Sequence, residues 1–260
     1  MDDAARIDAF LRWSEDTVAD RREPWRYGTA LFDDRFPNKW DANFLRVERP
    51  VGSATPAELA ADADRIQAHL RHRELIVEDD AEGARLAAGF VELGYEADRN
   101  VTMALHRRPD RPAPSIRAGE VGLADVRSLI VTANLVSHGG MTQDDAEMLA
   151  DHRRVAAERI GARLFAAWID GEMAGCCELY EHDAVAQVEN VDTLEPMRNR
   201  GAARAFIGAT IGAARAGGAD LVFLIADDAD WPKRLYAKLG FDEVAHFRQF
   251  TKPPEGESYR

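Results

Sequence analysis

Apolar residues recur along the chain with two different periods, one typical of helices and one typical of strands. In the second half, helical spacing covers residues 123–135, 144–160, 203–218 and 231–240. Extended segments rich in branched and aromatic residues cover 115–122, 162–170, 172–181, 184–194, 221–226 and 241–252. This alternation predicts an α/β or mixed α+β fold, in which helices flank a central sheet.

The first half closes with a similar order of elements. Helical spacing at 55–73 and 81–94 alternates with extended segments at 74–79 and 95–107. The last helix of each half also ends in a similar segment, ELGYEADR from Glu92 and KLGFDEVA from Lys238. We interpret this as an ancient duplication. Coincidence is the alternative, because a helix stopped by glycine and followed by a strand is common. The first 50 residues have no clear period, and for them we expect strands and loops.

Prolines and arginines crowd together between the halves, in the stretch HRRPDRPAPSIR from His106 to Arg117. Periodic patterning stops there, as expected of a linker between two packed units. The sequence therefore predicts two domains, 1–111 and 112–260.

Composition narrows the possible partners. The chain has 33 basic and 46 acidic residues, a formal charge of -13 that argues against nonspecific nucleic-acid binding. It has no apolar run of the roughly 18 residues that a membrane span needs, and it begins with acids rather than a secretory signal, so we expect a cytoplasmic protein. The two cysteines, Cys176 and Cys177, are adjacent. A mutual disulfide is therefore improbable, thiols are too few for a structural zinc site, and we expect no metal. We expect both cysteines to pack on a strand, with a reactive thiol as the alternative.

One turn carries a candidate binding site. In TLEPMRNRGAARAFIGA, from Thr193 to Ala209, an extended segment passes through Arg198, Arg200 and Gly201 into an alanine-rich helix. The first amides of a helix have no partner inside it, and the helix dipole is positive at that end. Gly201 permits unusual backbone dihedrals, and the arginines add charged donors. The turn thus predicts a phosphate or diphosphate site, and a solvated basic turn is the simpler alternative.

The spacing of Arg198, Gly201 and Ala203 resembles the Arg/Gln-x-x-Gly-x-Gly/Ala signature of the GNAT family of acyl-CoA-dependent N-acyltransferases. The later segment RLYAKLGF, residues 234–241, is similar to the family's LYEKLGF. The resemblance covers about residues 115–252. It implies a GNAT-like mixed sheet flanked by helices and acetyl-CoA as co-substrate. The N-terminal half then looks like a degenerate GNAT-like copy in a tandem protein, with Gly52, Ser53 and Ala54 where the arginine-glycine turn should be.

The resemblance also implies roles for individual residues. The turn amides would bind the pyrophosphate of acetyl-CoA, and the end of the preceding strand would pair with the pantetheine arm. Tyr236 matches a family tyrosine that gives a proton to the departing thiolate, although a tyrosine packed in the core is the alternative. The implied cofactor-binding residues are Val191, Asp192, Thr193, Arg198, Asn199, Arg200, Gly201, Ala202, Ala203 and Arg204.

The general base is less constrained by the resemblance. Glu189 on the strand before the turn is our candidate and Glu178 on the neighbouring strand is the alternative, while a solvated or ion-paired carboxylate is the simpler interpretation of either. His138 is a candidate for contact with the substrate from a loop. In place of the family's asparagine after the strand 221–226, this chain has Asp227, Asp228 and Asp230. These acids would face a cationic acceptor, or they would solvate a loop and cap the next helix through Asp230.

The function that follows is an N-acetyltransferase, in which a small-molecule or peptide primary amine attacks acetyl-CoA directly in a ternary complex. No cysteine or serine stands in an obvious nucleophilic setting, which argues against an acyl-enzyme. A noncatalytic acyl-CoA-binding module is the alternative function. A nucleotide-binding protein ranks below both, because the sequence lacks the glycine-rich phosphate loops of that class. We expect a monomer or a homodimer, with neither nucleic acid nor membrane as partner.

Overall fold

The structure is a computed structural model that describes residues 2–137 and 141–256. It divides into two compact units, each built from separate stretches of chain. The C-terminal unit comprises Met1–Val18, Thr102–Ile225 and Trp231–Val244, and the N-terminal unit comprises Ala19–Val101, Ala226–Asp230 and Ala245–Arg260. The units thus interleave segments of both halves. The predicted domain boundary near residue 112 separates two proposed copies along the sequence, which is a different division from these spatial units. It stays a prediction.

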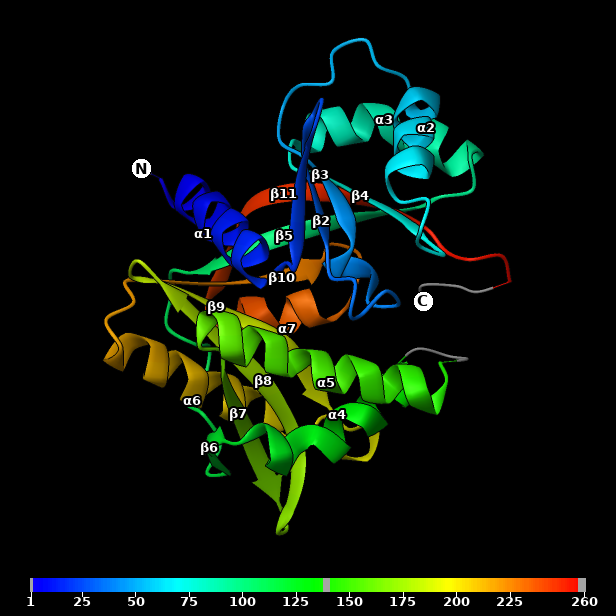
Figure 1. Ribbon diagram of the computed structural model, residues 1–260. Coiled ribbons are helices and arrows are strands. Elements are labelled where there is room, and N and C mark those ends of the chain that lie inside the picture. Colours follow the sequence, from blue (N-terminus) through cyan, green and yellow to red (C-terminus); the bar gives the residue numbers. More distant parts are fainter. Residues whose placement is uncertain (1, 138–140, 257–260) are drawn as a thin grey trace. The chain divides into compact units, whose positions relative to one another are not determined.

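The C-terminal unit is a mixed sheet flanked by helices (Figure 1). Its helices are α1 (Asp3–Val18), α4 (Leu123–Ser137), α5 (Gln143–Ile160), α6 (Ala202–Ala216) and α7 (Pro232–Leu239), with a short 3-10 turn, η2 (Glu195–Met197). Its strands are β6 (Arg117–Val121), β7 (Arg163–Ile169), β8 (Glu172–His182), β9 (Val185–Thr193) and β10 (Leu221–Asp227). Two further strands, β5 (Glu96–Leu105) and β11 (Phe241–Lys252), contribute residues to both units, and the last two residues of β10 belong to the N-terminal unit.

Within this unit the strand order is β5-β10-β9-β8-β7-β6. The pairs β6–β7, β7–β8 and β8–β9 are antiparallel, whereas β9–β10 is parallel. Helices α4 and α5 lie against one face of the sheet and α6 against the other (Figure 1). Helix α6 connects β9 to β10, as expected, because two parallel neighbouring strands need a crossover connection and this is usually a helix.

The N-terminal unit contains β1 (Arg21–Trp25), β2 (Gly28–Phe32), η1 (Trp40–Ala42), β3 (Phe44–Val47), α2 (Pro56–Ile66), β4 (Arg73–Val77) and α3 (Asp80–Glu92). Its strand order is β1-β2-β3-β4-β11, and β3–β4 is again a parallel pair that follows two antiparallel pairs. Both units therefore have antiparallel pairs followed by one parallel pair, with two preceding antiparallel pairs in this unit and three in the C-terminal unit. The last strands are exchanged, because β11 pairs with β4 and β5 lies beside β10.

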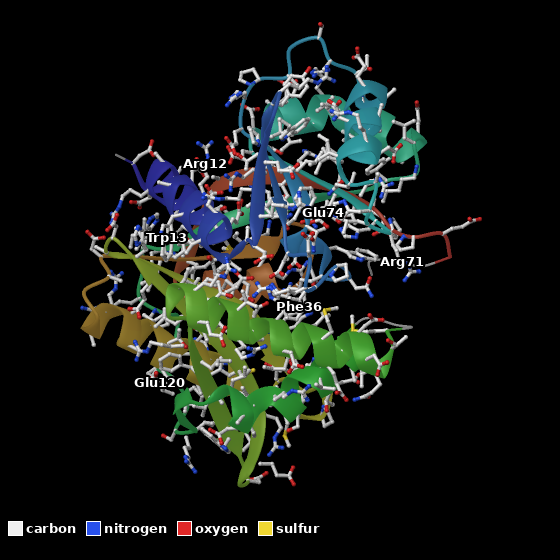
Figure 2. The ribbon with its side chains drawn as sticks, viewed as in Figure 1. Arg12, Trp13, Phe36, Arg71, Glu74 and Glu120 are labelled. Carbon is white, nitrogen blue, oxygen red and sulfur yellow. The ribbon has the colours of Figure 1, made fainter. Side chains whose placement is uncertain are left out.

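Residues 3–18 correct one expectation, because they form helix α1 rather than strands and loops. Ile7 and Phe10 lie one turn apart and are both buried, and Phe10 packs edge-on against Phe223 of β10. Trp13, labelled in Figure 2, stacks on His182 of β8 at 3.8 Å between ring centroids. The helical spacing of these apolar residues was present in the sequence. None of the helices within the described ranges is both long enough and apolar enough to cross a bilayer.

The two cysteines lie on β8 and are both buried. Cys176 belongs to a hydrophobic cluster with residues of α4 and α5, while the Cys177 sulfur lies 3.1 Å from the Thr210 hydroxyl of α6. Burial raises the pKa of the Cys177 thiol to about 12 and the pKa of Cys176 well above its usual value. Neither sulfur is therefore a thiolate near neutral pH, which agrees with a packing role.

His72 makes the N-terminal unit sensitive to acid. Its side chain is buried beside Trp40, and its Nε2 atom lies 3.2 Å from the Asn43 carbonyl. Burial is the largest cause that lowers its pKa to about 4, against a value of about 6.5 in an unfolded chain. Between these values the unfolded chain binds a proton that the folded unit does not. The folded state therefore loses stability as the pH falls through that window.

We expect wild type to lose about 2 kcal/mol more of its unfolding free energy than His72→Gln between pH 7 and pH 5. Urea unfolding at the two pH values measures the difference. Glu74→Gln is the control, because burial raises the pKa of the Glu74 carboxyl (Figure 2) and this group therefore favours folding as the pH falls. Removing it should steepen the acid loss. Equal pH dependence in wild type and His72→Gln would contradict the assignment.

Candidate functional site

Strands β9 and β10 separate part-way along their length. Their parallel pairing runs from Val185 opposite Leu221 to Gln187 opposite Phe223 and then stops, among the residues that the structure describes. Both strands nevertheless continue, β9 to Thr193 and β10 to Asp227. We call the opening between them the strand gap. On its β10-facing edge, β9 has backbone groups that a bound molecule can use.

A β-bulge lies beside the strand gap. Cys176 pairs with Asp192 and Glu178 pairs with Glu189, so β9 carries one residue more than β8 over this interval. Asn190 within the bulge has a backbone φ of 53°, which is unusual for a residue other than glycine. Bulges bend a strand and redirect its side chains. The end of β9 is therefore bent as it reaches the turn into α6.

The turn from Arg198 to Arg204, here called the anion turn, leads β9 into α6. Gly201 is the N-cap of α6 with a φ of 94°, and no side chain caps the helix. A Cβ at this glycine would also lie 3.2 Å from Pro114. The first helical bond runs from the Ala205 amide to the Gly201 carbonyl, so the amides before Ala205 have no acceptor inside the helix. The first turn contains no acid. These features fit an anion.

The three arginines of the anion turn differ in their surroundings. Arg198 is exposed, with its Nε atom 3.4 Å from the Thr193 carbonyl, and Arg200 forms a surface ion pair with Asp170 at 2.5 Å. Arg204 is buried, and its guanidinium pairs with Asp110 of the linker at 2.8 Å. The Arg204 side chain is thus engaged by the linker. Only its amide belongs with the open donors of the turn.

Tyr236 lies on α7, the helix that follows β10. The helix runs from Pro232 to Leu239 and is followed by the C-cap Gly240, whose φ of 104° suits a glycine. The Tyr236 side chain is 6% exposed, and its ring packs edge-on toward Phe241 at 6.4 Å between centroids. Its placement is compatible with the core role as well as with the catalytic one.

The two glutamates of the site have different environments. The Glu178 carboxylate is 1% exposed and accepts hydrogen bonds from Arg153 at 2.7 Å, Tyr180 at 2.5 Å and Asn190 at 3.2 Å. Glu189 is half-buried and accepts a bond from Gln187 at 2.5 Å. Three donors occupy Glu178, whereas a base needs a lone pair for the incoming proton. Glu178 is therefore poorly suited to accept a further proton.

Arg153 of α5 completes this cluster, because it also contacts Asp192 at 2.9 Å. Burial alone would lower the pKa of Arg153, but the charges of Glu178 and Asp192 outweigh it and the pKa is raised. Burial, and then the Glu178 charge, raises the pKa of Tyr180. Sequence reasoning missed Arg153, Tyr180 and the bulge at Asn190. No local pattern signals contacts between a helix and two strands.

The arrangement of strand gap, anion turn and following tyrosine helix lies within a segment that matches a known family. The model of the Acetyltransferase (GNAT) family matches residues 132–241. This segment is a GNAT acetyltransferase domain. The resemblance seen in the sequence is thereby confirmed, and with it acyl transfer as the general chemistry of the family.

Solved structures share the fold of the GNAT domain and extend the likeness beyond it. A GCN5-related N-acetyltransferase from Kribbella flavida is 22% identical, with a TM-score of 0.63 over 97% of this chain and 96% of its own. A conserved protein of unknown function from Staphylococcus epidermidis is 13% identical, with a TM-score of 0.70 over 92% and 95%. A tandem GNAT protein from the clavulanic acid biosynthesis pathway is 14% identical, with a TM-score of 0.50 over 82% and 76%. Curated proteins give no significant match. The predicted GNAT-like fold class is confirmed.

The N-terminal unit has a corresponding strand, turn and helix, but they are arranged differently from those of the GNAT domain. Helix α2 starts with a capping box, in which the Thr55 hydroxyl accepts from the Glu58 amide and the Thr55 amide donates to the Glu58 carboxylate at 2.8 Å. These bonds lower the pKa of Glu58, so the carboxylate stays charged. Strands β3 and β4 remain paired up to Val47, and the Glu78 amide donates to the Val47 carbonyl. Over its described residues, this unit has a self-capped, acidic helix start and no strand gap.

Two remaining predictions fall outside the cluster. The N-cap of α7 is Trp231 and no side chain caps that helix, so the expectation that Asp230 caps it was wrong. Asp227 instead accepts from the Ala229 amide, and Asp228 pairs with Arg99 at 2.7 Å. The loop before α7 is thus closed by a hydrogen bond to the Asp227 side chain, and not by a side-chain cap at the start of the helix. His138 lies outside the described residues.

Proposed function

We propose that the protein is an N-acetyltransferase, which transfers the acetyl group of acetyl-CoA to a primary amine by direct attack in a ternary complex. The observation that carries this proposal is the strand gap, which is followed, after the short turn η2, by the uncapped start of α6. An extended arm with a diphosphate at its end is a ligand that suits a strand edge followed by an anion turn.

The residues present suit acetyl-CoA as co-substrate. The diphosphate would be held by the open amides of the anion turn, from Arg198 to Arg204, with the exposed Arg198 adding charge at the rim. Val191, Asp192 and Thr193 would pair with the pantetheine arm through their backbone. The absence of an acid in the first turn of α6 favours this ligand, since a carboxylate there would repel the diphosphate.

Glu189 and Tyr236 would carry the proton transfers. The amine nitrogen forms a bond to the thioester carbon as the carbon–sulfur bond breaks, so one proton leaves the nitrogen and one proton is needed at the sulfur. Glu189 would accept the first and Tyr236 would donate the second. Glu178 is less suited to the base role because Arg153, Tyr180 and Asn190 already occupy its oxygens.

The second half would be the active copy of a duplicated unit, and the first half the degenerate copy. The shared succession of strand pairs supports the duplication, and the capping box of α2 supports the loss of an anion site from residues 1–111. We further propose the boundary near residue 112, where the linker segment begins.

Thiol release from acetyl-CoA tests the proposal. Purified full-length protein is incubated with acetyl-CoA and a panel of small amines, amino acids and peptides, and free CoA is measured with a thiol reagent. Stabilisation against heat by CoA, together with amine-dependent thiol release, is the expected result. CoA binding without thiol release for any amine would favour the noncatalytic acyl-CoA-binding module.

A further inference from the structure

We infer that Arg153 is a positioning residue, which holds the end of β9 in the shape that binds acyl-CoA. The inference rests on the proposed function and adds a residue that no signature of the family marked in this chain. Arg153 lies on α5 and reaches two strands at once, through Glu178 of β8 and Asp192 of β9.

The end of β9 needs such support because it is paired on one side only, with β8, and that pairing contains a bulge. Its pairing with β10 stops at Gln187, and its pairing with β8 is interrupted by the bulge around Asn190. A strand that has lost one ladder and carries a bulge in the other is less constrained than a fully paired strand. Asp192 lies just beyond the bulge, between the two other residues proposed to pair with the pantetheine arm.

Glu178 is the fixed end of this connection. Its carboxylate is 1% exposed and is held by donors from β8, β9 and α5. Asp192 is the adjustable end, since its side chain is 21% exposed and lies near the strand terminus. Arg153 joins them with separate guanidinium nitrogens, at 2.7 and 2.9 Å. A lysine carries one compact ammonium group and does not reproduce this planar two-sided geometry.

The variant Arg153→Lys keeps the charge and removes the bridge. We expect it to bind CoA about tenfold more weakly and to raise the KM for acetyl-CoA by a similar factor, with a smaller change in kcat. Asp192→Ala removes the same connection but keeps the Arg153–Glu178 pair, so it should reproduce the effect, and the double variant should be no worse than either alone. Arg154→Lys is the matched control, because the Arg154 side chain is exposed and pairs with Glu158 on the helix surface.

Calorimetry with CoA and thermal unfolding distinguish the outcomes. A lower melting temperature with unchanged CoA affinity in both Arg153→Lys and Asp192→Ala would overturn the inference and leave the proposed function standing. Wild-type protein that neither binds CoA nor releases thiol would contradict the proposed function itself, and the inference with it. If Arg153→Lys fails to fold, Asp192→Ala alone decides, because it leaves the buried pair in place.

Discussion

Ala203→Glu should reduce the affinity for CoA by about 100-fold while leaving the protein as stable as wild type or slightly more so. Ala203 is half-buried in the first turn of α6, two residues before Ala205, whose amide is the first that donates within the helix. A carboxylate there stabilises a helix through the dipole, yet it competes for the open amides and repels a diphosphate. Binding and stability therefore move in opposite directions.

The N-terminal unit shows the same device in its natural form. Glu58, in the first turn of α2, accepts from the Thr55 amide and closes that helix start. Ala203→Gln is the control, because it adds similar bulk without charge and should weaken binding much less. Titration calorimetry with CoA, combined with thermal unfolding of each variant, measures both quantities. Unaltered CoA affinity in Ala203→Glu would place the diphosphate elsewhere.

Tyr236→Phe should lower kcat by about 100-fold, since a positioned proton donor commonly contributes 100-fold or more. The buried hydroxyl is the only group that the substitution removes, and the ring packing toward Phe241 is kept. CoA affinity and the KM for acetyl-CoA should change little, because the proton is needed as the thiolate departs.

A comparison of different acceptor amines, and of a second tyrosine variant, sharpens this test. The kcat loss should be the same for every accepted amine, because the leaving group is common to all of them. Tyr180→Phe is a useful comparison, since this hydroxyl donates to Glu178 and not to a reacting group in our proposal. Wild-type turnover by Tyr236→Phe would assign the tyrosine to the core, which its 6% exposure also allows.

Much of the C-terminal unit could be predicted because its local signals are strong. Gly201 adopts a left-handed conformation, in keeping with the unusual backbone dihedrals that a glycine permits, and Gly240 adopts the left-handed conformation common at a helix C-cap. The helices and strands between residues 115 and 252 follow the period of their apolar positions. Helix α1 shows the same period at Ile7 and Phe10, so its sequence contained the signal of a helix even though strands and loops were expected there.

The candidate site could be predicted only in part. The anion turn is contiguous, and its residue types suffice to indicate what it could bind. The different surroundings of Arg198 and Arg204 could not be predicted, because the partner of Arg204 is Asp110, more than 90 positions away. Arg153 gave no signal for a related reason. A charged residue on a predicted helix is normally solvated, and only the approach of β8 and β9 makes it a buried bridge.

The sequence by itself determined where helices and strands form and which turn opens a helix through a glycine, because propensity, periodicity and glycine conformation act over a few residues. The tertiary structure decided which strand completes each sheet, where β9 and β10 part, and which acids surround Arg153. Strands β5 and β11 begin within the similar segments ELGYEADR and KLGFDEVA, so their sequences predict strands without specifying the strands they pair with. The choice depends on pairing and burial between segments more than 100 residues apart, as when Phe250 of β11 stacks on Phe90 of α3.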